Sequence, residues 1–168
     1  MIGLSCLLAF SLAACAGSQT SGTESVSDSA QQESTGGVQI QNPFVDCDSL
    51  DQAAETAGFD FSVPEKTPNG ASASVFRVMK DQMIEVAYSS DADKHTLRKA
   101  RGSEDASGNY ISFDKVEEIT VGESVVTVKG DGEKVYVATW NTGDFAFSID
   151  AENGLTQDDV IAMISEMK

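Results

Sequence analysis

From Ser74 onward, short stretches of alternating apolar and polar residues are separated by turn sequences. A period of two predicts strands rather than helices. The turn sequences, such as Gly130-Asp131-Gly132 and Asn141-Thr142-Gly143, are short enough to join neighbouring antiparallel strands. A longer joint, residues 102–114, is predicted to be a surface loop. We therefore predict an antiparallel meander with strands at 74–80, 83–89, 95–101, 116–121, 124–129, 134–140 and 144–150.

Two predicted helices flank these strands. Ser49 precedes an apolar stripe and has Gln52 three residues on, as in a capping box, and Gly58 is placed to end that helix. Thr156 precedes a second helix with an acidic first turn. Its predicted apolar face consists of Val160, Ile161, Ile164 and Met167. The predicted fold class is α+β: a single curved antiparallel sheet of about seven strands packed with an N-terminal and a C-terminal helix.

The strand at 134–140 is apolar on both faces. Tyr136 and Trp140 are expected to point one way, and Val135 and Val137 the other. One sheet face is expected to hold the helices. The second face needs a cover: sheet curvature, the loop near Tyr110 and Phe113, or a ligand. The candidate ligand face consists of Tyr136, Trp140, Phe145 and Phe147.

The N-terminal sequence is typical of a bacterial lipoprotein. Residues 1–14 are mostly apolar but too short to span a bilayer, which needs roughly 20 apolar residues. Leu12-Ala13-Ala14-Cys15 places a signal cleavage site between Ala14 and Cys15, and Cys15 is the predicted site of diacylglyceryl and palmitate attachment. No Lys or Arg precedes the apolar run, so we expect a truncated signal peptide. The alternative is an apolar N-terminal helix packed on the domain.

The predicted domain organisation follows from this pattern. Residues 1–14 form the signal peptide, 15–37 the lipidated cysteine and a flexible Ser/Gly/Gln linker, and 38–168 one globular domain. We expect the protein on the extracytoplasmic face of the cell membrane, at a Gram-positive surface, held by Cys15. The net charge of −16 disfavours binding to nucleic acid and to anionic lipid headgroups. We expect a monomer.

The sequence offers little for catalysis. His95 is the single histidine, and a solvated residue at a strand edge is preferred over the base of a hydrolase. Cys47 has no cysteine partner once Cys6 leaves and Cys15 is acylated, and we expect an inert thiol. No metal site, cofactor or catalytic residue is predicted. Four basic residues form a candidate patch for an anion or a protein partner, although ion pairs such as one with Glu85 are preferred: Lys94, Arg98, Lys99 and Arg101.

A series of short motifs resembles a known bacterial family, the domain of unknown function numbered 4367. In order these are Asn42-Pro43-Phe44, Ser49-Leu50, Ala57-Gly58-Phe59, Val63-Pro64-Glu65, Met83-Ile84-Glu85-Val86, Leu97-Arg98-Lys99-Ala100, 102–108, Val137-Ala138-Thr139-Trp140 and 145–149. The resemblance covers nearly all of residues 40–168. The family occurs on envelope lipoproteins and on membrane-tethered proteins resembling anti-sigma factors. The resemblance implies an extracytoplasmic, non-enzymatic binding or sensing module.

The sequence thus favours a non-catalytic envelope lipoprotein that binds an envelope protein or a small ligand. One alternative is a carrier or sensor of a lipid or other hydrophobic ligand on the second sheet face. A hydrolase dependent on His95 is the least favoured function.

Overall fold

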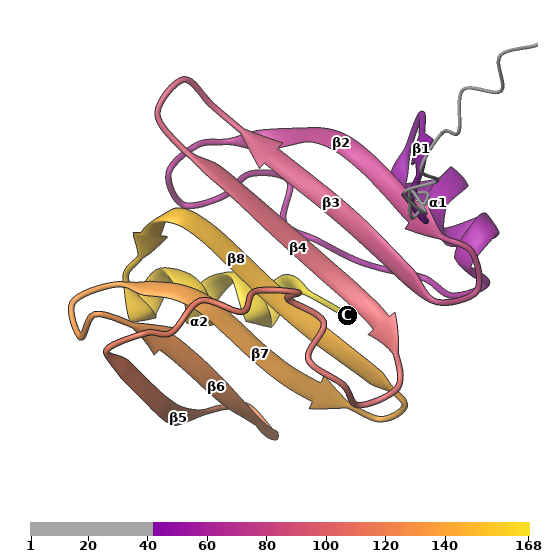
Figure 1. The fold of residues 1–168 in the computed structure, drawn as a ribbon. Coiled ribbons are helices and arrows are strands. Elements are labelled where there is room, and N and C mark those ends of the chain that lie inside the picture. Colours follow the sequence, from indigo (N-terminus) through magenta and orange to yellow (C-terminus); the bar gives the residue numbers. More distant parts are fainter. Residues whose placement is uncertain (1–41) are drawn as a thin grey trace, which may run out of the picture. The chain divides into compact units, whose positions relative to one another are not determined.

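The structure, a computed structural model, describes residues 42–168. Eight strands form one open sheet, accompanied by two helices (Figure 1). The elements are β1 (Val45–Cys47), α1 (Leu50–Ala57), β2 (Ser72–Met79), β3 (Met83–Ser89), β4 (Lys94–Arg101), β5 (Lys115–Val121), β6 (Ser124–Gly130), β7 (Val135–Thr142), β8 (Phe145–Leu155) and α2 (Gln157–Glu166). The predicted α+β class with an antiparallel sheet is confirmed, with eight strands instead of seven. The additional strand, β1, has three residues, which is too short for a recognisable alternation.

The strand order is β1-β2-β3-β4-β8-β7-β6-β5, and all neighbouring strands are antiparallel. Two four-stranded meanders therefore lie side by side, and β8 joins them by pairing with β4 in the register Leu97↔Ile149. The prediction of one continuous meander was wrong at this point, because β5 does not pair with β4. Pairing on both sides also explains why β8 is longer than predicted: its end pairs with β7 through Leu155↔Val135.

The predicted helix caps are present. The Ser49 hydroxyl accepts a hydrogen bond from the Gln52 amide at 3.2 Å, and the Gln52 side chain accepts one from the Asp48 amide at 2.7 Å. Gly58 ends α1 with a φ of 70°, a left-handed conformation that glycine adopts without steric cost. Thr156 caps α2 as predicted. The α2 face differs by one position, because Met163 is buried and Ile161 is only half-buried.

Both helices pack on one face of the sheet, in a single apolar core. Helix α1 contacts β2 and β3, and α2 contacts β7 and β8 (Figure 1). The central row of this core runs across the sheet through Val86, Leu97 and Ile149, all fully buried. Each meander thus has its own helix on this face, which leaves the opposite face for other segments. We call this opposite face the second face.

Candidate functional site

The segment 102–114, which we call the strap, crosses the second face in front of β7 and β8 (Figure 1). Ala106 of the strap packs against Ala100 of β4 and Ala146 of β8. The Asn109 amide donates a hydrogen bond to the Asp150 carboxylate at 3.2 Å. The strap contacts Ala100 on β4 and Ala146 on β8, and these two residues lie side by side because β4 pairs with β8. The sequence left three possible covers for this face: sheet curvature, the loop or a ligand. In the structure the loop, as the strap, lies over the second face at β7 and β8.

Two further contacts hold the strap down. The Arg98 guanidinium on β4 donates a hydrogen bond to the Ser107 carbonyl oxygen. Lys129 on β6 forms an ion pair with Asp105 at 2.9 Å. These polar attachments come from strands of both meanders, so the position of the strap depends on the assembled sheet. Burial raises the pKa of Asp105, but hydrogen bonds from Ser107 and Lys129 outweigh it, and the net shift is downward.

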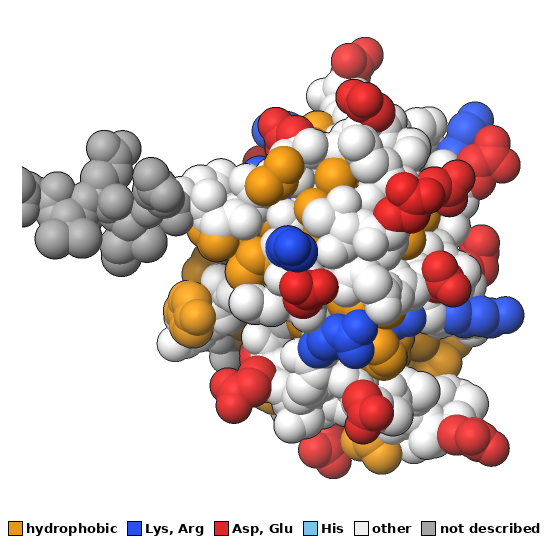
Figure 2. Space-filling model, turned by 90° about the vertical axis from the view of Figure 1, so that its right-hand side faces the viewer, with side chains coloured by type: hydrophobic (Ala, Val, Ile, Leu, Met, Phe, Trp, Pro, Cys, Tyr) orange, Lys and Arg blue, Asp and Glu red, His pale blue; other side chains and the backbone are white. Residues whose placement is uncertain are grey.

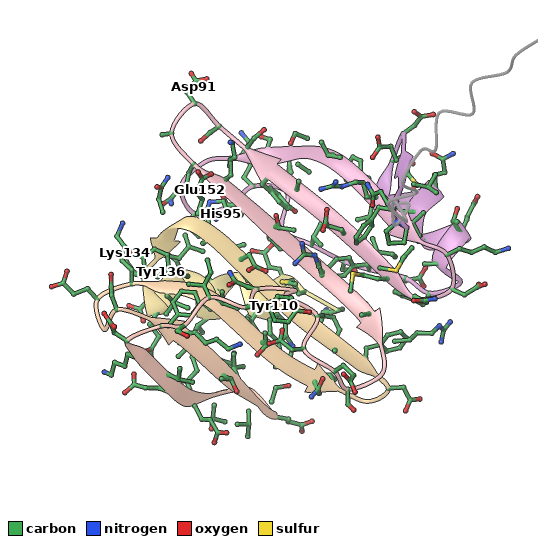
Figure 3. All side chains as sticks on the ribbon, viewed as in Figure 1. Asp91, His95, Tyr110, Lys134, Tyr136 and Glu152 are labelled. Carbon is green, nitrogen blue, oxygen red and sulfur yellow. The ribbon has the colours of Figure 1, made fainter. Side chains whose placement is uncertain are left out.

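A groove of about 420 Å³ lies between the distal part of the strap and the strands β4, β7 and β8. Figure 3 shows Tyr110 on the strap, Tyr136 on β7 and Glu152 on β8 around this region. We call its apolar and aromatic residues Ile111, Phe113 and Tyr136 the wall, the less exposed Asp150 the floor, and the exposed Lys94 and Glu152 the rim. The lining residues are Lys94, Thr96, Asn109, Ile111, Phe113, Tyr136, Asp150, Ala151 and Glu152.

The aromatic part of the wall is ordered by its own contacts. The rings of Phe113 and Tyr136 stack with their centroids 6.1 Å apart. The Tyr136 hydroxyl donates a hydrogen bond to the Asp131 carboxylate at 3.1 Å, which raises the pKa of the phenol. Ile111 of the wall is 70% exposed, and Tyr110, the residue before it in the strap, is 96% exposed. The groove therefore opens to solvent beside an exposed aromatic side chain.

Asp150 is the buried acid of the groove floor. Burial raises its pKa, and this effect exceeds the lowering by the Asn109 hydrogen bond and by the Arg98 charge. Arg98 lies 3.4 Å from the Asp150 carboxylate, but it also pairs at 2.7 Å with Glu85, which is almost fully buried. Glu85 has a second ion-pair partner in Arg77, whereas Arg98 is the only basic side chain within ion-pair distance of Asp150 among residues 42–168.

The structure separates the candidate ligand face into two parts. Trp140 and Phe147 stack at 5.3 Å between centroids inside the helix-covered core, where both are buried. Phe145 packs against Phe59, which follows the end of α1. Tyr136 alone lies on the second face, because a register shift next to it changes the alternation along β7. Of the four aromatics, only Tyr136 lines the groove.

The candidate basic patch is also dispersed. Lys99 and Arg101 point into the core side, where they donate hydrogen bonds to the carbonyl oxygens of Asp60 and Gly58 beyond the end of α1. Both lie over aromatic rings, and the Lys99 ammonium is 4.5 Å from the Phe145 centroid. Arg98 points to the opposite face, and its expected ion pair with Glu85 is confirmed. Lys94 reaches the rim of the groove.

His95 is not a solvated strand-edge residue, and that prediction was wrong. It is 1% exposed, because β4 is an interior strand between β3 and β8. Its Nε2 atom lies 3.3 Å from the Asp93 carboxylate, but neither ring nitrogen has a hydrogen-bond partner within the described residues. Burial lowers the pKa of His95, and Asp93 opposes the shift only in part. The side chain lies on the other side of β4 from Lys94 and Thr96, away from the groove.

This burial predicts a loss of stability on mild acidification. The unfolded chain protonates His95 near its ordinary pKa of 6.5, whereas the folded chain does so only at lower pH. The folded state is therefore at full stability above pH 6.5 and loses stability as the pH falls from there toward about 5, before most carboxylates titrate. Urea unfolding at both ends of this range should show a smaller loss for His95→Gln than for the wild type. An equal loss in both proteins would contradict the prediction.

The remaining predictions concern Cys47, metal ligands and the N-terminal segment. Cys47 is half-buried on β1, and burial followed by the charges of Asp48 and Asp46 raises its pKa, which disfavours the reactive thiolate. Within residues 42–168, no group of three potential metal ligands was found. Neither of the two helices in this part of the chain has the length and apolar character to cross a membrane. The predicted cleavage and acylation positions, Ala14 and Cys15, lie outside the described residues.

Comparison with known proteins does not assign this chain to a family. Searches of protein-family models, of curated proteins and of solved structures each found no match to this chain. The resemblance to the family numbered 4367 stays a prediction.

Sequence reasoning missed most of the groove. Asp150 and Asn109 are separated by 41 residues, and their contact depends on the pairing of β4 with β8. One feature of the sequence could have indicated that the strap is ordered. Asp105, Ser107 and Asn109 occur at every second position, and each of their side chains accepts a hydrogen bond from the backbone amide two residues further on. Such a series indicates an ordered loop.

Proposed function

We propose that this chain is a non-catalytic, lipid-anchored binding protein of the cell envelope. In this proposal Cys15 carries the anchor, the following residues form a tether, and the domain presents the groove beside the strap to a small ligand outside the cytoplasm. The groove is the observation that carries the proposal. The lipoprotein-like N-terminal sequence and the resemblance to family 4367 support the location.

The groove has the properties of a small-molecule site. Its volume of about 420 Å³ lies in the range of known ligand pockets, roughly 300 to 1,000 Å³. Ile111, Phe113 and Tyr136 supply an apolar wall, and Asp150 and Asn109 supply polar groups at fixed positions. A loop that carries the wall on a rigid sheet is a common arrangement for binding sites.

A carrier of hydrophobic ligands is the second candidate, and the apolar wall is the observation in its favour. A carrier has to enclose its cargo, however, and this groove is open beside Tyr110 and Ile111, which are 96% and 70% exposed. Trp140 and Phe147, the aromatics expected at a carrier site, pack against each other in the core. These observations favour a binding or sensing module. His95 is buried and away from the groove, which disfavours the hydrolase.

Binding at the groove is testable with a neutral apolar fluorophore, N-phenyl-1-naphthylamine. The full chain is used with Cys15→Ala, so that neither detergent nor an acyl chain competes for the probe. We expect saturable fluorescence enhancement, and a roughly ten-fold weaker affinity for Tyr136→Ala, because loss of one aromatic wall removes on the order of 1.4 kcal/mol of contact. Val45→Ala, exposed on β1, is the matched control and should bind normally. Unsaturable binding, or equal affinity in the Tyr136 variant, would contradict the proposal.

The anchor is tested separately. Cys15→Ala should move the full-length protein from the membrane fraction to the soluble fraction and abolish labelling with a fatty-acid probe, because two acyl chains are needed for stable attachment. Cys47→Ala changes the cysteine count equally and should leave both readouts unaltered. Membrane retention and labelling of the Cys15 variant would refute the lipid assignment.

A further inference from the structure

We propose that the groove binds a small organic cation, a protonated amine with an aromatic or branched aliphatic body. This inference rests on the proposed function and deepens it by naming the ligand class. The juxtaposition that carries it is an aromatic pair, Phe113 and Tyr136, lining the same groove as two carboxylates, Asp150 and Glu152.

Two carboxylates line the groove, Asp150 and Glu152, against one basic residue, Lys94. The Asp150 side chain is 20% exposed, and its one ion-pair partner, Arg98, also pairs with the buried Glu85, which has Arg77 as a second partner. Arg98 also donates a hydrogen bond to the Ser107 carbonyl of the strap, and it is not one of the residues that line the groove. Burial raises the pKa of Asp150 more than Asn109, Arg98 and Lys129 lower it. A ligand ammonium group beside Asp150 would favour its charged form.

Lys94 is the one basic residue among those that line the groove. Its ammonium lies 3.8 Å from Glu152, and the two side chains are 70% and 60% exposed. An ion pair this open contributes little and rearranges readily. Lys94 can therefore turn to solvent when a cation enters, and Glu152 then faces the ligand together with Asp150.

The aromatic wall and the electrostatic field of the whole molecule both favour a cation over an anion. Aromatic faces attract cations through their quadrupole, whereas they offer an anion no comparable gain. The net charge of −16 concentrates cations near the surface and repels anions. Figure 2 shows acidic side chains spread over the face on the right of Figure 1, between fewer basic ones. An anion of equal size would meet both carboxylates and this field.

The test compares two ligands that share one phenyl body, 2-phenylethylamine and 3-phenylpropionate. Chemical-shift titrations of the isotope-labelled full chain with Cys15→Ala would follow Ala151 and Ile111, which line the groove. We expect the amine to bind at least about ten-fold more tightly than the acid. Equal affinity, or a preference for the acid, would overturn the inference.

Three variants locate the effect. Asp150→Asn and Glu152→Gln should each weaken amine binding several-fold, whereas Lys94→Gln should strengthen it, because it removes the competing cation. Glu152 is exposed, so its variant stays informative even if Asp150→Asn proves unstable. Amine affinity unchanged in both Glu152→Gln and Lys94→Gln would count against the inference.

The neutral probe separates the two proposals. Saturable binding of N-phenyl-1-naphthylamine without a preference for the amine leaves the proposed function standing and refutes the cation. Failure of the probe and of both phenyl ligands to bind refutes the proposed function as well.

Discussion

Replacing Trp140 by alanine is expected to lower the free energy of unfolding by about 3–5 kcal/mol. Trp140 is 6% exposed, and its indole stacks on Phe147 with 8° between the ring planes. Phe147 in turn packs on Phe61, which precedes the connection into β2. Truncation removes a large buried surface and leaves a cavity that the surrounding strands cannot close, because their positions are set by backbone pairing.

The measurement is urea unfolding followed by far-ultraviolet circular dichroism, since Trp140 is the single tryptophan and its fluorescence is lost in the variant. Val125→Ala on β6 is the control. Val125 is 59% exposed, and its truncation should change stability by less than about 0.5 kcal/mol. A loss of under about 1 kcal/mol for the Trp140 variant would mean that this aromatic stack contributes far less than a core contact.

The second large effect is expected for Arg98→Met, with a loss of about 3 kcal/mol. Methionine keeps the apolar stem but removes the guanidinium that pairs with Glu85, Asp150 and the Ser107 carbonyl. Glu85 is 3% exposed and retains only Arg77 as an ion-pair partner. Breaking a buried pair by removing one partner is costly, because the remaining charge stays away from water.

Lys94→Met, on the same strand, is the matched control for the Arg98 variant. Its ion pair with Glu152 is exposed, so we expect a loss below about 1 kcal/mol. Hydrogen exchange gives a second readout, because strap amides such as those of Ser107 and Asn109 should exchange faster in Arg98→Met. Similar losses in both variants, or unaltered strap exchange, would show that the strap is held by other contacts.

Local features of the chain were predictable because their causes are local. The seven predicted strands occur close to their predicted bounds, apart from the later end of β8, since alternation and turn residues act within a few positions. The helix caps at Ser49, Gly58 and Thr156 follow from short-range hydrogen bonds and backbone conformation. The ion pair between Arg98 and Glu85 was predictable because these residues lie on adjacent strands of one hairpin.

The candidate site was predicted only in fragments. Tyr136 and Lys94 were named for two different surfaces, and the structure brings them to one groove. Their neighbours Asp150 and Asn109 were missed, because the strap reaches β8 only after the two meanders have joined. Burial of His95 was missed for the same reason, since a hairpin strand next to a long loop looks like a sheet edge until another strand covers it.

The residue pattern alone determined the α+β class, the positions of seven strands and the helix caps at Ser49, Gly58 and Thr156, because these depend on interactions between residues near each other in the chain. Only the tertiary structure decided that β8 lies beside β4, that the strap covers the second face and that a groove opens beneath its distal end. The pairing of distant strands depends on how much apolar surface each possible arrangement buries. The pattern of residues within one strand does not specify which distant strand pairs with it.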